Sequence, residues 1–169
     1  MLRGEKKVGT ESLTGTLKAA GLGGIAGVRS MAAPALLARA IRRGDVDGLA
    51  GTPFAALGSG RTPALLEVLM IGEMVGDKTP FIPARTSAPA LLGRVLSGAL
   101  VGATLSVSGQ RGGASGALVG ALSALAGVYA VDRLRSGATQ GLGVPDRVFG
   151  LLEDGLVLSL GTRLLRRPG

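Results

Sequence analysis

The sequence predicts an all-α integral membrane protein, a helix bundle of four to five segments packed through glycine-rich contacts, with residues 1–169 forming a single membrane domain. Hydrophobic residues make up 46% of the chain and charged residues 18%, compared with about 25% charged residues in soluble domains. Glycine occupies 30 positions, whereas aromatic residues make up only 2%, too little large side-chain volume for a soluble core. The mean hydropathy of +0.43 excludes a polar disordered chain.

The first apolar segment covers residues 13–41 and follows a basic tail at residues 1–12. Lys18 interrupts this segment and Arg29 ends its first part, a pattern that favours a retained membrane segment over a signal peptide. The segment is longer than the roughly 20 residues of a simple span. We therefore expect it to be interrupted.

Pro34 is the expected point of interruption. Proline has no N–H to donate, and it disfavours helical structure at the residue before it. The segment is thus expected to be broken or kinked at Pro34. Two alternatives are open: separate helices at residues 13–28 and 34–43 joined by a hinge at residues 29–33, or one kinked helix.

Four further apolar segments follow, at residues 63–75, 89–107, 113–131 and 148–165. The third and fourth of the five segments have the length of a full span. The second is short for a span, and the last carries two adjacent carboxylates, Glu153 and Asp154. Loops are expected at residues 44–61, 76–88 and 132–147.

Glycines recur four residues apart inside the apolar segments, which places them on one helix face. The predicted contact residues are Gly23, Gly27, Gly98, Gly102, Gly112, Gly116 and Gly120. In lipid no hydrophobic force holds helices together, so small residues that allow close backbone approach mark the contacts. The spacing predicts tight packing within the chain, with a second copy in a homo-oligomer, or with a larger membrane complex.

The charged and hydroxyl residues of the apolar segments are the candidates for function. An uncompensated charge at the bilayer centre costs about 2.5–3.5 kcal/mol on insertion scales. The binding or transport candidates are Arg29, Ser30, Glu73, Asp77, Lys78, Arg85, Glu153 and Asp154. They form either interior ion pairs, with Arg94 and Glu67 as further partners, or a polar path in which a carboxylate binds a cation or shuttles a proton.

The sequence gives little support for catalysis, metal binding or nucleic-acid binding. The chain has no cysteine and no histidine, which excludes disulfides, thiol nucleophiles, zinc–thiolate sites and histidine-based acid–base catalysis. We predict no catalytic residue and no metal ligand, and the sequence identifies no cofactor. The net charge of +8 comes from bases that flank apolar segments, without aromatic stacking residues. This pattern points to lipid headgroups rather than nucleic acid.

Three stretches of the sequence resemble a known family: residues 27–34 around Arg29 and Ser30, residues 72–87, and residues 152–154. The chain is similar, from about residue 13 to residue 165, to the bacterial membrane-protein family called domain of unknown function number 4126. The resemblance implies a multi-span inner-membrane protein. It marks the eight candidates named above as the positions to test. That family has no assigned activity to carry over.

The leading hypothesis is a small transporter or channel-like homo-oligomer in the cell inner membrane. The alternatives are an accessory subunit that docks on a larger complex through its glycine faces, and a lipid-modifying enzyme. With five spans, seven lysines and arginines fall on one side of the membrane and eight on the other. This balance predicts either that one segment re-enters without crossing or that insertion is dual.

Overall fold

The computed structural model describes residues 2–76, 87–141 and 145–166. Within these ranges the chain is helical and has no β-strand, so the predicted all-α class is confirmed. The elements are α1 (Leu2–Val28), α2 (Ala32–Arg43), the 3-10 helix η1 (Pro53–Gly58), α3 (Thr62–Gly76), α4 (Ala88–Ser108), α5 (Gly113–Gly141) and α6 (Asp146–Leu165). Each of the five predicted apolar segments coincides with helical structure, and the first is divided between α1 and α2.

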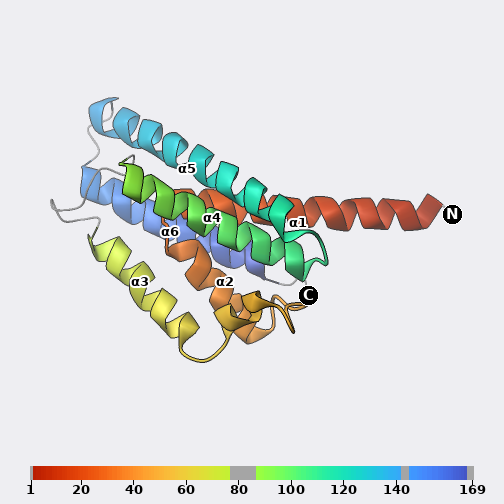
Figure 1. Cartoon of the computed structure of the whole chain (residues 1–169). Helices are drawn as coiled ribbons and strands as arrows, with labels where there is room; N and C mark the ends of the chain where they lie inside the picture. Colours follow the sequence, from red (N-terminus) through yellow and green to blue (C-terminus); the bar gives the residue numbers. More distant parts are fainter. Residues whose placement is uncertain (1, 77–86, 142–144, 167–169) are drawn as a thin grey trace.

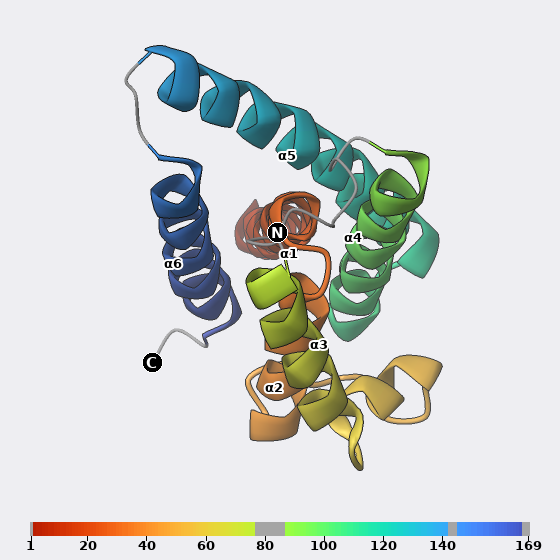
Figure 2. The ribbon, with the colours of Figure 1, turned by 90° about the vertical axis from the view of Figure 1, so that its left-hand side faces the viewer.

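Helix α1 occupies the centre of the bundle, and the other helices surround it (Figure 2). Its N-terminal end projects beyond them (Figure 1). The stretch predicted as a basic tail, residues 1–12, is helical from Leu2 as part of α1. The predicted loop at 132–147 is also shorter than expected, since α5 continues to Gly141. Of the predicted loop at 76–88, residues 77–86 lie outside the described residues.

Glycine determines how closely α1, α4 and α5 approach one another. Gly23 of α1 and Gly98 of α4 both face the backbone of Gly120 in α5, and a Cβ on either would lie 2.5 Å from the Gly120 carbonyl oxygen. Gly102 lies against Gly116 in the same way, and Gly27 lies against Ala124. Such distances are possible only without a side chain. Gly112 differs: it precedes α5, and its nearest contact is the Ser115 hydroxyl.

The chain reverses direction between α1 and α2. Helix α1 runs antiparallel to α6, because Gly21 contacts Leu164 and the side chain of Ile25 lies against Gly161. Helix α2 returns along α6, with Leu36 against Gly161 and the C-terminal half of α2 beside the C-terminal end of α6. We call α1, α2 and the turn at residues 29–31 the α1–α2 hairpin.

The position of the break corrects the sequence-based expectation. Helix α1 ends at Val28 and α2 already begins at Ala32, so Pro34 is the third residue of α2 rather than its first. Proline is tolerated in the first helical turn, where its missing N–H would have no intrahelical acceptor. Of the two alternatives, the structure has the two separate helices, and the break between them lies at Arg29, Ser30 and Met31.

The interior combines an aliphatic core, with Leu22, Leu37 and Val101 fully buried, with several buried polar side chains, and many large apolar side chains are exposed. The exposed large side chains include Leu65, Val68, Ile71, Leu92, Leu96, Leu118, Leu122, Leu151, Leu152 and Leu156, on four different helices. In contrast, Arg29, Arg94, Ser97 and Glu153 are buried. The buried charges and the many exposed large apolar side chains both depart from the usual pattern of a soluble domain. Two helices, α4 and α5, are long and apolar enough to span a membrane.

The ion pair between α2 and α3 is expected to contribute little to stability. Arg39 Nε lies 3.2 Å from Glu67 Oε1, with the Arg39 side chain 53% exposed. Exposed pairs are worth about 0–1 kcal/mol because water screens them. We therefore expect Glu67→Gln to change the free energy of unfolding by less than about 1 kcal/mol in denaturant titrations. A larger loss would show that this pair is shielded from water.

Candidate functional site

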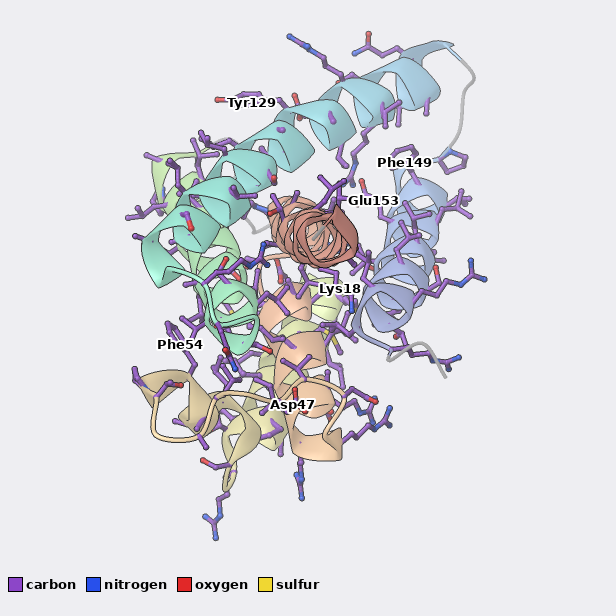
Figure 3. All side chains as sticks on the ribbon, turned by 90° about the vertical axis from the view of Figure 1, so that its right-hand side faces the viewer. Lys18, Asp47, Phe54, Tyr129, Phe149 and Glu153 are labelled. Atoms are coloured by element: carbon purple, nitrogen blue, oxygen red, sulfur yellow. The ribbon has the colours of Figure 1, made fainter. Side chains whose placement is uncertain are left out.

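The turn of the α1–α2 hairpin carries a buried arginine that pairs with α6. Arg29 is 1% exposed, and its Nε donates a hydrogen bond of 2.8 Å to Asp154 Oδ1. Its Nη2 lies 2.8 Å from the same oxygen and 3.7 Å from Glu153 Oε2. Arg135 of α5 adds a contact of 3.9 Å to Glu153 Oε2. Figure 3 shows Glu153 on the side of α6 that faces α1.

On the opposite side of the turn, Glu73 of α3 binds the start of α2. Its Oε1 accepts hydrogen bonds from the Ser30 backbone N–H at 2.8 Å and the Ser30 hydroxyl at 3.0 Å. Its Oε2 accepts the Met31 backbone N–H at 2.8 Å. The first N–H groups of a helix have no intrahelical acceptor. The Glu73 carboxylate therefore acts as a cap supplied by another helix, placed where the helix dipole favours negative charge.

Helix α4 binds the carbonyl groups at the end of α1. Arg94 Nη1 donates to the carbonyl oxygens of Gly27 at 3.1 Å and Val28 at 3.2 Å. The Ser97 hydroxyl donates to the Ser30 carbonyl oxygen. Arg94 Nη2 also lies 3.8 Å from Glu73 Oε1, so that α3 and α4 are linked through the same turn. The backbone groups released by the helix break thus find partners on α3 and α4, while the Arg29 side chain is paired by α6.

The turn lies close to the middle of the bundle. Ser97 is the tenth of the 21 residues of α4, and Asp154 is the ninth of the 20 residues of α6. At a rise of 1.5 Å per residue, the turn is about 12–17 Å from either end of these helices. We call the set of side chains that hold it the turn cluster: Arg29, Glu73, Arg94, Arg135, Glu153 and Asp154, with the hydroxyls of Ser30 and Ser97. Three arginines and three carboxylates balance its formal charge.

Sequence reasoning located part of this cluster. Arg29, Ser30, Glu73, Glu153 and Asp154 meet at the turn. The predicted residues Asp77, Lys78 and Arg85 lie outside the described residues. The set of site candidates omitted Arg94, Arg135 and Ser97. Arg94 was considered only as an ion-pair partner, and Arg135 fell in a range predicted to be a loop. Ser97 lies among the small residues of the predicted contact face of α4, and this was the sequence feature that could have indicated it.

The turn cluster can bind a cation or move a proton only by exchanging partners. Each of its carboxylates already accepts hydrogen bonds or contacts from arginine or from backbone N–H groups. A competing ligand must therefore replace one of those donors, and the α1–α2 hairpin is the element whose position depends on them.

Comparison with family models, with curated proteins and with solved structures finds no match for this chain.

Proposed function

We propose that this chain is a small multi-pass inner-membrane protein of transporter or channel-like type, working as a homo-oligomer, with the turn cluster as its functional centre. The observation that carries the proposal is the break of a helical segment at mid-depth of an apolar bundle, held by buried charges on three other helices. Broken helices at mid-membrane depth are tolerated where they are buried in protein or line a cavity. They form the substrate and ion sites of many transporters. The resemblance to domain of unknown function number 4126 is part of the same proposal.

The outer surface supports insertion in lipid. Helix α3 exposes apolar side chains such as Leu65, Val68 and Ile71, and α6 exposes Leu151 and Leu156. A soluble monomer rarely exposes contiguous apolar surface of this extent, whereas hydrocarbon is its natural environment. We propose that α3, α4, α5 and α6 cross the membrane, although α3 has only 15 residues and fits a locally thinned bilayer or a partial crossing.

The α1–α2 hairpin then enters from one side and returns to it. Its two outer ends lie at the same end of the bundle as the α4–α5 turn, because Arg111 Nη1 donates to Thr16 Oγ1 and the Ser108 hydroxyl donates to the Asp47 carbonyl oxygen. We call this the basic end of the bundle. A re-entrant hairpin is one of the two explanations that the even charge count left open.

The re-entrant topology makes the charge distribution uneven. Among the residues whose side chains are described, the basic end carries Arg39, Arg42, Arg43, Arg61, Arg111, Arg163 and Arg166. The opposite end carries Arg133, and Arg135 belongs to the turn cluster. Positive charge is retained in the cytoplasm during insertion. The proposed orientation therefore places the basic end, with the N-terminus, in the cytoplasm.

The alternative role, docking on a larger complex through glycine faces, has less support. Gly23, Gly98, Gly102, Gly116 and Gly120 face one another within this chain. Their close approaches are already occupied by α1, α4 and α5, so an accessory subunit would have to use other surfaces.

Removing the charge of Glu73 tests the transport proposal. We expect Glu73→Gln, reconstituted in liposomes, to lose proton flux driven by a potassium diffusion potential, because the neutral amide cannot take up and release a proton. Flux is measured with a pH-sensitive dye inside the vesicles. Glu67→Gln is the matched control, since it removes a carboxylate from the same helix but outside the turn cluster.

Two results would count against transport. Wild-type flux equal to that of empty vesicles would reject a proton path. A Glu73→Gln protein that inserts, keeps its oligomeric mass and conducts like the wild type would show that the carboxylate serves only to cap α2. Loss of the folded protein itself, seen as an aggregated peak on gel filtration in detergent, would support the purely structural interpretation of this residue.

A further inference from the structure

We propose that a cavity between α2 and α6, at the basic end of the bundle, binds the phosphate group of an anionic phospholipid. This inference rests on the proposed membrane insertion but not on transport. The cavity has a volume of about 210 Å³ and lies between the C-terminal halves of the two helices. It is separate from the turn cluster, because none of its lining residues belongs to that cluster.

The charges around the cavity favour an anion. Three guanidinium groups line it, those of Arg39, Arg43 and Arg166, together with one carboxylate, that of Asp45. Arg39 pairs with Glu67, so Arg43 and Arg166 are the remaining bases of the cavity, with Asp45 as the one carboxylate beside them. Both are exposed at its rim, one on each helix. Arginine binds phosphate through two parallel N–H donors, so two facing arginines suit a phosphate diester.

The remaining walls of the cavity favour a lipid over a free phosphate ion. Leu36 of α2 and Leu165 of α6 are both buried and form apolar surface beneath the arginines. Further along α6, Leu158 and Leu160 lie on the outside of the bundle. The cavity is too small for whole acyl chains, so it fits a headgroup phosphate while the chains run along the exposed leucines of α6. Basic pockets between helices at the cytoplasmic surface are a recurring form of anionic lipid site.

The position along the membrane normal agrees with this assignment. Arg43 ends α2 and Arg166 immediately follows α6. Both helices end at the level where the hydrocarbon core of a bilayer would meet the headgroups if α6 crosses it. A phosphate held there by both arginines would link the returning arm of the α1–α2 hairpin to α6, the helix that also pairs with Arg29.

The test compares lipid binding by two double variants that remove equal charge from the same end of the protein. Arg43→Gln/Arg166→Gln removes the rim of the cavity, whereas Arg42→Gln/Arg61→Gln removes two exposed arginines that do not line it. Full-length protein in mild detergent is titrated with phosphatidylglycerol or phosphatidylcholine, and bound lipid is counted by native mass spectrometry. We expect wild type to bind phosphatidylglycerol about ten-fold or more tightly than phosphatidylcholine, and only the cavity variant to lose this preference.

Three outcomes would overturn the inference. Equal loss in both double variants would show diffuse attraction to a basic surface. Equal binding of the two lipids by wild type would show no anionic site. Inorganic phosphate that displaces phosphatidylglycerol at similar concentration would identify a free-anion site. Resistance of the protein to carbonate extraction from membranes separates these outcomes from failure of membrane insertion itself, and the liposome flux assay reports on transport independently.

Discussion

Replacing Arg29 with methionine is expected to lower the free energy of unfolding by about 3–5 kcal/mol, because it leaves two carboxylates buried without their main cation. Arg29 binds Asp154 through two nitrogens at 2.8 Å and contacts Glu153 at 3.7 Å. Methionine has a similar length and retains much of the packing, so the loss reports on charge rather than on volume. Unfolding is followed by helical circular dichroism during denaturant titration in detergent micelles.

A second substitution separates the buried charge from other effects of the Arg29 change. Asp154→Asn in the Arg29→Met background removes the unpaired carboxylate and should restore part of the lost stability, while Glu153 keeps its contact with Arg135. Asp154→Asn alone should destabilise, since Arg29 then loses its closest anion. If Arg29→Met costs no more than Glu67→Gln, the buried pair does not hold the α1–α2 hairpin against α6.

Gly120→Ala is expected to cost about 3 kcal/mol or to prevent folding, because the added methyl group meets the backbone of α4 at two residues. A Cβ at this position would overlap the carbonyl oxygen of Gly98 and lie 3.1 Å from the Cα of Gly102. Gly23 approaches the same residue from α1. Backbone cannot rotate away as a flexible side chain can, so α4 would have to move away from α5. Thermal unfolding of the purified protein measures the change.

Gly93→Ala provides the matched control on a neighbouring helix. A Cβ on Gly93 of α4 would have no atom within 4 Å, and alanine is favoured over glycine in helices by about 1 kcal/mol. We expect this variant to have an unchanged or higher Tm. A similar loss of stability in both variants would show that alanine at glycine positions disturbs the protein for a reason other than helix contact.

The helical segments were predictable because their signal is local. A run of apolar residues about as long as a membrane span is visible in consecutive positions of the sequence. The helices Ala88–Ser108 and Gly113–Gly141 accordingly begin within one residue of the predicted ranges. One of the two sequence-based alternatives ended the first helix at Val28 and placed a hinge at residues 29–33, and the structure agrees with it except that α2 begins two residues before Pro34. The preference of proline for the first turn of a helix suggested that the second helix starts at Pro34. The groups that hold the turn at residues 29–31 come instead from α3, α4 and α6. Those partners lie far away in sequence, so local pattern could not identify the residue.

The reversal of the chain at this turn could not be predicted for a related reason. A kink and a hairpin contain the same apolar segments and the same proline. They differ in whether α2 continues away from α1 or returns beside it. Leu36 of α2 lies against Gly161 of α6, as Ile25 of α1 does, so α2 returns beside α1. The even charge count was the one sequence signal of re-entry, and it had a competing explanation in dual insertion. The meeting of Glu73 with the turn likewise depends on the placement of α3 beside α2.

The re-entrant α1–α2 hairpin is tested most directly by thiol accessibility, because the chain has no cysteine and each variant then carries a single thiol. The exposed positions are Leu13, Ala50 and Ala114 at the basic end, and Gln140 at the opposite end. Each is replaced by cysteine and exposed to a membrane-impermeant maleimide in right-side-out or inverted membrane vesicles. We predict labelling of Leu13→Cys, Ala50→Cys and Ala114→Cys in inverted vesicles only, and of Gln140→Cys in right-side-out vesicles only. Labelling of Leu13→Cys and Ala50→Cys from opposite sides would show that the segment crosses the membrane, which contradicts the hairpin.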